Sequence, residues 1–322
     1  MSDLHPDSVA FLELLAKAGG TPFHEMPLEV QRSASEKMMF AFRPMPPEVA
    51  RATEAGMARP DAAGGPLRYR LYRPLGSGPE ERLPALVWYH GGGCVVGNIE
   101  SYDSLCRELA NRSGCAVVAA SYRLAPEAPF PAAVEDAFFA LQWTAAHADA
   151  LHLDASRLAV GGDSAGGYLA IVAALLARDG GGPALRFQLL VYPGTDQRGE
   201  RDSHRRYGQG YLLSQDSLRY FQRCYFRDDA ERLDWRASPI LAPTLAGLPP
   251  ALVLTASHDP IVDDCRAYAE RLAAEGVAVR YAEYAGQLHG FFALGKAFRE
   301  AGSAVAEAAA ALGAALRPDQ VA

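Results

Sequence analysis

The sequence is poor in cysteine, and this scarcity argues against two kinds of site. Five cysteines occur among 322 residues, scattered and odd in number, and none forms a Cys-x-x-Cys pair. No histidine cluster has the spacing of metal ligands, so we expect neither a metal site nor a bound cofactor. We interpret the cysteines as free thiols rather than a disulfide framework, which indicates a reducing compartment.

Long hydrophobic runs and strongly basic segments are also missing. No apolar stretch approaches the length of a transmembrane span, and the N-terminus lacks the cationic region and apolar core of a signal peptide. The formal net charge of −7 argues against binding to nucleic acid or to an anionic membrane. Residues 201–206 are locally basic but include Asp202, and we interpret them as a solvated loop. These absences predict a cytoplasmic protein without stable membrane insertion.

A serine set among glycines is the first feature that indicates chemistry. The motif Gly162-Asp163-Ser164-Ala165-Gly166 lies between an apolar run at 158–160 and an Ala/Leu-rich helical pattern at 168–178. A serine on a sharp strand-to-helix turn is a nucleophile elbow, and small neighbours let the strand and helix close around it. The N–H of Ala165 then opens the helix without an intrahelical partner. Taken alone, the motif could also be a Gly/Ser-rich loop without function.

A second glycine cluster lies upstream of the elbow. His90-Gly91-Gly92-Gly93 follows the apolar run at 86–89, and its glycines allow backbone N–H groups to approach a developing oxyanion. A phosphate-binding loop is the alternative. It is disfavoured because the Lys-Ser/Thr of a P-loop is missing and neither cluster fits G-x-G-x-x-G. The two motifs in this order predict a serine nucleophile with an oxyanion loop.

Strand and helix patterns alternate along most of the chain, which predicts an α/β protein. Apolar on both faces, the strand runs favour a mostly parallel sheet with helices on both sides. Strands are expected at 67–72, 86–89, 115–121, 158–160, 189–192, 251–255 and 277–284, and helices at 102–111, 131–146, 168–178, 261–274 and 296–316.

Two segments interrupt this alternation and are candidates for a cap. Helical patterns at 8–18 and 27–42 precede the first expected strand, so they form either part of a lid or an ordinary N-terminal extension. Residues 195–235 make an insertion of a length that is usually functional. We therefore expect N-terminal cap helices in residues 1–50 and a catalytic domain in 51–322, with 195–235 as a second cap segment.

The base of a catalytic triad must be sought among the histidines after Ser164, because chain order in this kind of site is Ser, acid, His. His204 lies inside the insertion and is a poor candidate. His258 is next to Asp259, the candidate acid, and cannot easily point to the same side, so we assign it a secondary or structural role. His289 follows a predicted strand, at the sheet edge where sites in open α/β sheets collect, and is the predicted base.

The acid is expected after the preceding strand. Asp259 occupies that place, whereas Asp263 and Asp264 open the next helix, where we expect them to complement its dipole. The residues therefore predict a triad of Ser164, Asp259 and His289.

Five motifs in this order resemble the bacterial hormone-sensitive-lipase-like carboxylesterases of the Gly-Asp-Ser-Ala-Gly-Gly type. They are His90-Gly91-Gly92-Gly93, Tyr122-Arg123-Leu124-Ala125-Pro126-Glu127, Gly162-Asp163-Ser164-Ala165-Gly166-Gly167, Asp259-Pro260 and His289-Gly290-Phe291. The resemblance implies the α/β-hydrolase fold, with an eight-stranded sheet and a helical cap built from the N-terminal helices and the insertion. It also implies the triad named above and an oxyanion hole formed by the N–H groups of Gly91, Gly92 and Ala165.

Substrate preference is the least determined property. Cys94 follows the glycine loop where the resembled family commonly has a bulky residue, Ser257-His258 replaces Gly and an apolar residue, and Ala285 stands where Pro is frequent. Apolar residues of the cap segments indicate a covered pocket. The predicted pocket residues are Cys94, Asp163, Tyr192, Tyr211, Leu213 and Leu288.

The predicted function is ester hydrolysis through an acyl-enzyme, and the resemblance implies acyl groups of short to medium chain length. An amidase or arylformamidase with the same triad is the first alternative, since both substrates form an acyl-enzyme. A receptor that has lost catalysis is the second. The expected partner is a small-molecule ester, and the sequence leaves the oligomeric state open, a homodimer included.

Overall fold

A twisted eight-stranded sheet forms the centre of the computed structural model, which describes residues 3–59 and 65–318. Its strand order is β1-β2-β4-β3-β5-β6-β7-β8. The first pair and the contact of β2 with β4 are antiparallel, and all other neighbours are parallel. The strands are β1 (Arg51–Met57), β2 (Leu67–Arg73), β3 (Leu83–Tyr89), β4 (Ala116–Ala120), β5 (Leu153–Asp163), β6 (Leu185–Val191), β7 (Ala251–His258) and β8 (Val279–Leu288). The predicted α/β-hydrolase fold with a mostly parallel sheet is confirmed.

The central strands are buried because their sequences are apolar on both faces. Every residue of β4 is buried, and so is nearly all of β3. The edge strand β1 was missed by the sequence analysis, because its side chains are mostly exposed and show no apolar alternation. Pairing with β2 along its whole length, together with burial of Met57, holds β1 in the sheet.

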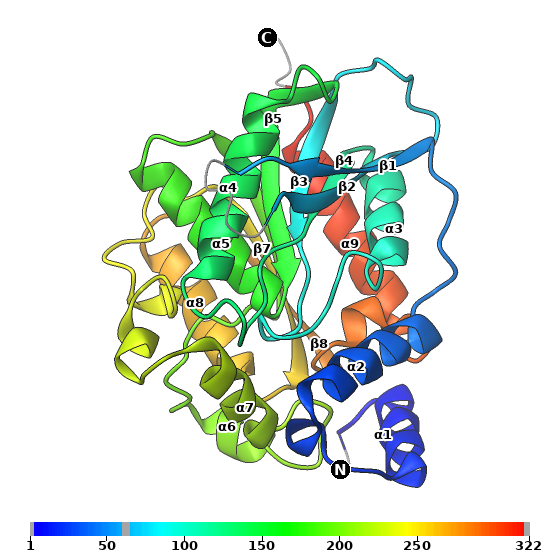
Figure 1. Cartoon of the computed structure of the whole chain (residues 1–322), viewed down its shortest axis with the longest axis vertical. Helices are drawn as coiled ribbons and strands as arrows, with labels where there is room; N and C mark the ends of the chain where they lie inside the picture. Colours follow the sequence, from blue (N-terminus) through cyan, green and yellow to red (C-terminus); the bar gives the residue numbers. More distant parts are fainter. Residues whose placement is uncertain (1–2, 60–64, 319–322) are drawn as a thin grey trace.

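Helices cover both faces of the sheet, as the alternation predicted (Figure 1). On one face α3 packs against α9, and on the other α4 packs against α5, with α8 against β7 and β8. The helix α5 is buried almost all round because it lies between the sheet and its neighbours. The bounds are α3 (Asp103–Ser113), α4 (Ala132–Ala146), α5 (Ala165–Asp179), α8 (Val262–Ala274) and α9 (Glu300–Ala315).

The two candidate cap segments lie together at the end of the sheet where the parallel strands finish (Figure 1). The N-terminal segment contains α1 (Pro6–Ala18), the short η1 (Phe23–Glu25) and α2 (Leu28–Phe42), and the insertion contains α6 (Asp202–Arg206), α7 (Gln215–Tyr225) and η2 (Ala230–Leu233). The segments touch through Phe23 and Phe221, whose ring centroids are 5.9 Å apart. Arg32 ties α2 to the catalytic part, donating to the carbonyls of Val95 and Ala125 and to the carboxylate of Glu127.

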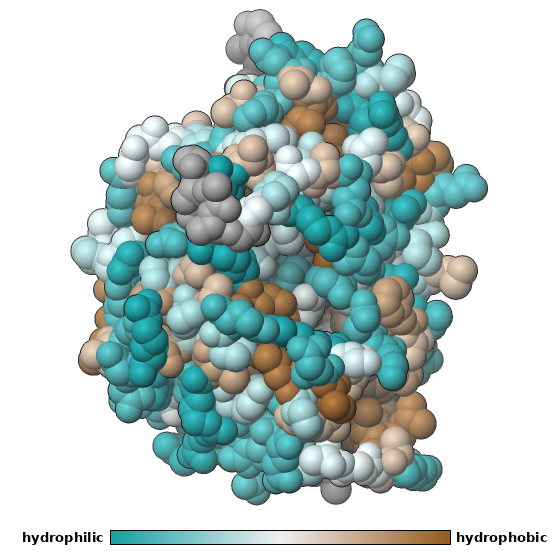
Figure 2. All heavy atoms as spheres, viewed as in Figure 1, coloured by the Kyte–Doolittle hydropathy of each residue, from teal (hydrophilic) through white to brown (hydrophobic). Residues whose placement is uncertain are grey.

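The surface is mainly hydrophilic on the face shown in Figure 2, with hydrophobic residues gathered over α1 and α2. Leu14, Val30 and Phe40 are among the exposed apolar side chains of those helices. Among the described residues, no helix has the length and hydropathy needed to cross a bilayer.

Candidate active site

Ser164 occupies a strained turn between β5 and α5. Its φ of 53° and ψ of −116° lie in a region that residues other than glycine rarely adopt, at a cost of about 1–3 kcal/mol. A Cβ on Gly166 would collide with the carbonyl of Tyr89, and one on Gly162 would collide with Gly166. The motif therefore needs its glycines because strand and helix approach each other too closely for a side chain.

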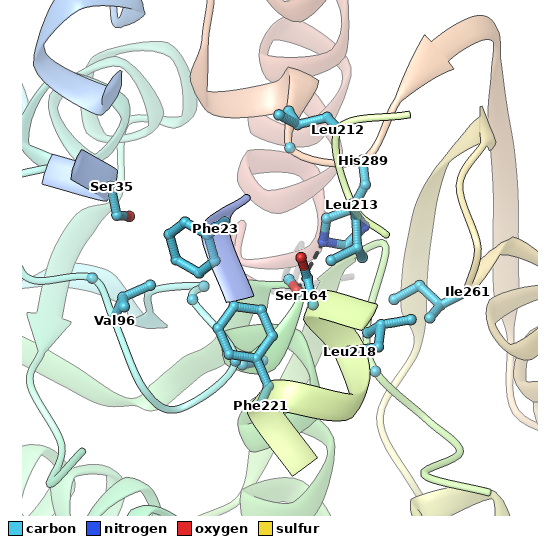
Figure 3. A pocket seen from close by; sticks show the side chains of 18 of the residues that line it. Phe23, Ser35, Val96, Ser164, Leu212, Leu213, Leu218, Phe221, Ile261 and His289 are labelled. Atoms are coloured by element: carbon cyan, nitrogen blue, oxygen red, sulfur yellow. Dashed lines mark hydrogen bonds between the residues drawn. The ribbon is translucent and has the colours of Figure 1, made fainter. Parts of the chain in front are cut away.

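Ser164, His289 and Asp259 form a continuous chain of hydrogen bonds. Ser164 Oγ lies 2.9 Å from His289 Nε2 (Figure 3), and His289 Nδ1 lies 2.6 Å from Asp259 Oδ2. Asp259 is 0% exposed, and its other oxygen accepts the N–H of Ile261 at 2.9 Å. A carboxylate on Nδ1 holds that proton in place, which leaves Nε2 as the acceptor for the serine proton. The three side chains predicted as a triad are thus brought together.

The oxyanion loop after β3 departs from the prediction at Gly91. The Gly91 N–H donates to Asp163 Oδ1 at 2.9 Å, with the Tyr102 hydroxyl 3.2 Å from the same nitrogen. A Cβ on Gly91 would lie 2.6 Å from Asp163 Oδ2, so the loop and the carboxylate are in close contact. Because this N–H already has an acceptor, the assignment of Gly91 to the oxyanion hole is wrong.

The next residues of the loop take the place expected of Gly91. Gly92, Gly93 and Ala165 line the cavity that contains Ser164, and their N–H groups have no hydrogen-bond acceptor among the described residues. Gly93 was missed, although the third glycine of the motif was the available signal. The arrangement offers three N–H donors in the lining of the cavity that contains Ser164.

The carbonyls of the loop are fixed by its neighbours. His90 donates from Nδ1 to the Gly91 carbonyl at 2.8 Å, the Tyr122 hydroxyl donates to the His90 carbonyl at 2.7 Å, and Val96 N–H donates to the Gly92 carbonyl at 2.9 Å. Burial lowers the pKa of His90 to about 4, so the ring stays neutral at physiological pH. The loop is therefore rigidly held, with its carbonyls directed to the protein.

Asp163, directly before the nucleophile, is a buried carboxyl group. It is 3% exposed and accepts the Tyr102 hydroxyl on Oδ2 at 2.8 Å. Burial raises its pKa to about 6, against the opposing effects of the Tyr102 hydrogen bond and the nearby His289. Tyr102, which reaches Asp163 from the start of α3, was not predicted as a site residue.

A cavity of about 780 Å³ opens over Ser164 between the cap segments and the sheet (Figure 3). Both cap segments contribute apolar side chains to it, and the loop after β7 contributes Ile261. The apolar lining includes Leu15, Phe23, Met38, Met39, Phe42, Val96, Leu212, Leu213, Leu218, Phe221, Phe226, Ile261, Ala293 and Leu294. Cys94, Asp163 and Leu213 line it as predicted, but Phe23 and Ile261 had no signal in the sequence.

The other three predicted pocket residues do not line this cavity. Tyr192 lies behind His289, with ring centroids 4.6 Å apart, and Leu288 is buried at the end of β8. Tyr211 packs against Tyr207 and His258. The pocket assignment is wrong for Tyr192, Tyr211 and Leu288, because their proximity in sequence to site residues does not fix the direction of their side chains.

The segment expected to be a solvated loop is the helix α6, which packs against the start of α8. Its Ser203 and His204 are buried. Ser203 N–H donates to Asp263 Oδ2 at 2.9 Å, and His204 Nε2 lies 2.7 Å from Asp264 Oδ2. Asp263 and Asp264 therefore hold the insertion in place, beyond the helix-dipole role that was predicted for them.

Comparisons with known proteins agree with this geometry. A family model described as alpha/beta hydrolase fold matches residues 86–293. The chain is 40% identical over 309 residues to an ethyl acetate hydrolase of Pseudomonas putida, covering 92% of this chain and 95% of that protein. It is 44% identical over 237 residues to the carboxylic ester hydrolase LipN of Mycobacterium tuberculosis, covering 71% of this chain and 62% of that protein.

Two solved structures match nearly the whole chain. A thermostable esterase from Pseudomonas putida superposes with a TM-score of 0.94 at 32% identity, covering 99% of both chains. An alpha/beta hydrolase enzyme from the metagenome of Lake Arreo superposes with a TM-score of 0.93 at 42% identity, covering 98% of this chain and 99% of that one.

Proposed function

The chain belongs to the bacterial hormone-sensitive-lipase-like serine carboxylesterases of the α/β-hydrolase fold. We propose that it hydrolyses short- to medium-chain acyl esters in the cavity over Ser164, with Ser164, His289 and Asp259 as the catalytic residues. The observation that carries these roles is the hydrogen-bonded chain from Ser164 Oγ through His289 to Asp259. Such a chain is the arrangement by which a serine hydroxyl is activated.

In the acylation step Ser164 Oγ attacks the ester carbonyl while His289 Nε2 takes its proton. The carbonyl oxygen becomes an oxyanion, which the N–H groups of Gly92, Gly93 and Ala165 stabilise. His289 then donates its proton to the departing alcohol, and the acyl group stays on Ser164. Asp259 keeps the imidazole oriented and stabilises its charged form.

In the deacylation step water takes the place of the alcohol. His289 removes a proton from the water, which attacks the acyl carbonyl, and the same N–H groups stabilise the second oxyanion. The carboxylic acid leaves when Ser164 Oγ recovers its proton from His289. Each half of the cycle therefore uses the same base and the same donors.

The cavity supports a substrate of modest size. A volume of about 780 Å³ lies within the range of about 300–1,000 Å³ found for small-molecule sites. Its apolar lining suits an alkyl chain, and both candidate cap segments contribute side chains to that lining. We propose residues 1–50 and 195–235 as this cap.

The proposed partner is a small-molecule ester, with no nucleic acid and no membrane insertion. A cytoplasmic location is proposed because the cysteines are free and four of the five are buried, as suits a reducing compartment. Sedimentation measurements would distinguish a monomer from a homodimer.

The test is a series of p-nitrophenyl esters from acetate to palmitate, with wild type and Ser164→Ala assayed side by side. We expect a maximum at short chains and a fall in kcat of at least about 10³-fold in the variant. A variant that keeps more than a tenth of the activity would remove Ser164 from its role. Parallel rates on an ester and its matching amide measure the preference between those two substrates.

A further inference from the structure

One end of the cavity is polar, and the mechanism described above makes no use of it. This end is lined by residues 196–199 and by His204. Most of its groups have partners within the cap: Arg198 Nη2 donates to Asp196 Oδ2 at 2.7 Å, and the Gln197 carbonyl accepts from Arg232 at 3.0 Å. These groups are therefore occupied in holding the insertion together.

His204 differs from its neighbours because one of its ring nitrogens has no partner. The residue is 3% exposed, and its Nδ1 is buried without a hydrogen-bond partner among the described residues. Of the described side chains that line the cavity, it is the only one with such an atom. A buried polar atom without a partner is unfavourable, so a native structure usually supplies one.

The unpaired edge of the ring is directed to the cavity wall at Gly199. A Cβ on Gly199, which itself lines the cavity, would lie 3.9 Å from both Nδ1 and Cε1 of His204. Gly199 has a φ of 70° and no side chain, so nothing but backbone stands at this point. No side chain of residue 199 therefore stands between this edge of the ring and the cavity lining.

Asp264 determines which ring nitrogen carries the proton. Its side chain is 1% exposed, with Oδ2 at 2.7 Å from His204 Nε2 and Oδ1 at 3.2 Å from Arg201 Nε. A carboxylate accepts only, so Nε2 carries the hydrogen. Nδ1 is therefore an acceptor, and its complement is a hydrogen-bond donor.

The position of His204 connects it to the reaction centre. Its neighbour Ser203 donates from Oγ to the carbonyl of Pro260 at 2.7 Å, in the connection that carries Asp259. Ile261 of the same connection lines the cavity, and Figure 3 shows Ile261 and Leu218 on the side of Ser164 opposite Phe23. The polar end is thus connected to the segment that carries both Asp259 and Ile261.

We propose that His204 Nδ1 is a substrate-recognition group that accepts a hydrogen bond from a hydroxyl or amide N–H on one arm of the ester. The enzyme then prefers hydroxyl-bearing esters to alkyl esters of the same shape. This proposal rests on the proposed function, because it takes Ser164 as the nucleophile of the same cavity.

The test compares pairs of esters in which a terminal hydroxyl replaces a methyl group. The pair 3-hydroxypropyl butanoate and butyl butanoate examines the alcohol arm, and ethyl 6-hydroxyhexanoate and ethyl heptanoate examine the acyl arm. The ratio of kcat/KM within each pair is measured by pH-stat for wild type and for His204→Gln. Gln can keep a donor toward Asp264 while removing Nδ1, and the exposed His147→Gln serves as the matched control.

We expect the hydroxyl-to-alkyl ratio to fall about three- to tenfold in His204→Gln for one of the two pairs, as the loss of one hydrogen bond requires. His147→Gln should leave both ratios unchanged. If wild type hydrolyses all four esters and His204→Gln changes neither ratio, the inference is overturned while the proposed function stands. If wild type hydrolyses none of them, it is the proposed function that fails.

A second variant separates recognition from stability. His204→Asn is too short to reach Asp264 but keeps a polar atom near the position of Nδ1. We expect it to melt at a lower temperature than His204→Gln and yet to retain more of the hydroxyl preference. Should the preference follow the melting temperature in the two variants instead of the presence of that atom, His204 is structural and the proposal is wrong.

Discussion

The N–H of Gly91 donates to the carboxylate of Asp163, with 2.9 Å between nitrogen and Oδ1. Gly91 belongs to the oxyanion loop, and Asp163 is bonded directly to the nucleophile Ser164. The hydrogen bond therefore fixes the two halves of the site relative to each other. It also occupies the first N–H of the loop, whereas the N–H groups of Gly92 and Gly93, which line the cavity, have no acceptor among the described residues.

Replacing Asp163 by alanine is expected to loosen this connection. The loop loses the acceptor of Gly91, so the donors of Gly92 and Gly93 are no longer held, and kcat should fall by about 10²-fold, as when an oxyanion donor is lost. KM should change little, because the apolar lining that binds the substrate is untouched. Steady-state kinetics on p-nitrophenyl butyrate measure both.

The control for this prediction is Asp163→Asn, which keeps an acceptor for the Gly91 N–H. We expect it to retain most of the kcat lost in the alanine variant. Equal losses in the two variants would mean that the negative charge matters and that the hydrogen bond to the loop does not.

The ionisation of Asp163 predicts a pH-dependent stability. Its pKa is about 6 in the folded protein against an ordinary 3.8, so between about pH 4 and 6 the folded state binds the proton more tightly. The contribution of this group to the free energy of unfolding therefore falls as pH rises through that window. Above pH 7 the pKa difference lowers the free energy of unfolding by at most about 3 kcal/mol.

Asp163→Asn removes this effect and should be more stable than wild type at pH 7.5. We expect the difference in the free energy of unfolding to shrink by about half at pH 5. Urea denaturation at both pH values measures it. A difference independent of pH would show that the carboxyl group does not titrate in this range.

The assignment of the acid can be tested against its neighbours. Asp259→Asn should lower kcat/KM by about 10⁴-fold, because an amide beside His289 Nδ1 favours the wrong tautomer. Asp263→Asn should have little effect on kcat/KM, since Asp263 touches Ser203 and not the triad. The assignment would be reversed if Asp263→Asn were the damaging change on the same ester.

The nucleophile, base and acid could be predicted because each lies in a motif at the end of a strand. Short-range patterns determine where strands end, and parallel strands bring those ends together. The sheet was predictable for the same reason, except β1, whose mostly exposed residues show no apolar alternation and are held by backbone pairing with β2 and by ion pairs of Glu54 with Arg68 and Arg70.

The direction of individual groups was not predictable. Which N–H of the loop faces the substrate depends on successive glycine conformations, such as the φ of 123° at Gly92 and 62° at Gly93. Likewise, His204 is buried through a contact with Asp264, 60 residues away in the chain. No local pattern in residues 201–206 carries that information.

The aromatic contact between the cap segments gives a last prediction, on chain-length preference. Phe221 packs against Phe23, with ring centroids 5.9 Å apart, and a Cβ on Gly93 would lie 2.5 Å from the Phe221 ring. The ring therefore limits the cavity beside the oxyanion loop.

Phe221→Ala should open this wall and raise kcat/KM for p-nitrophenyl octanoate relative to p-nitrophenyl butanoate by at least about tenfold. The stability cost should be below about 3 kcal/mol because the ring is only half-buried. Tyr220→Ala is the matched control, since Tyr220 neighbours Phe221 but does not line the described cavity. An equal shift in both variants would mean that α7 has moved as a whole and that Phe221 is not the wall.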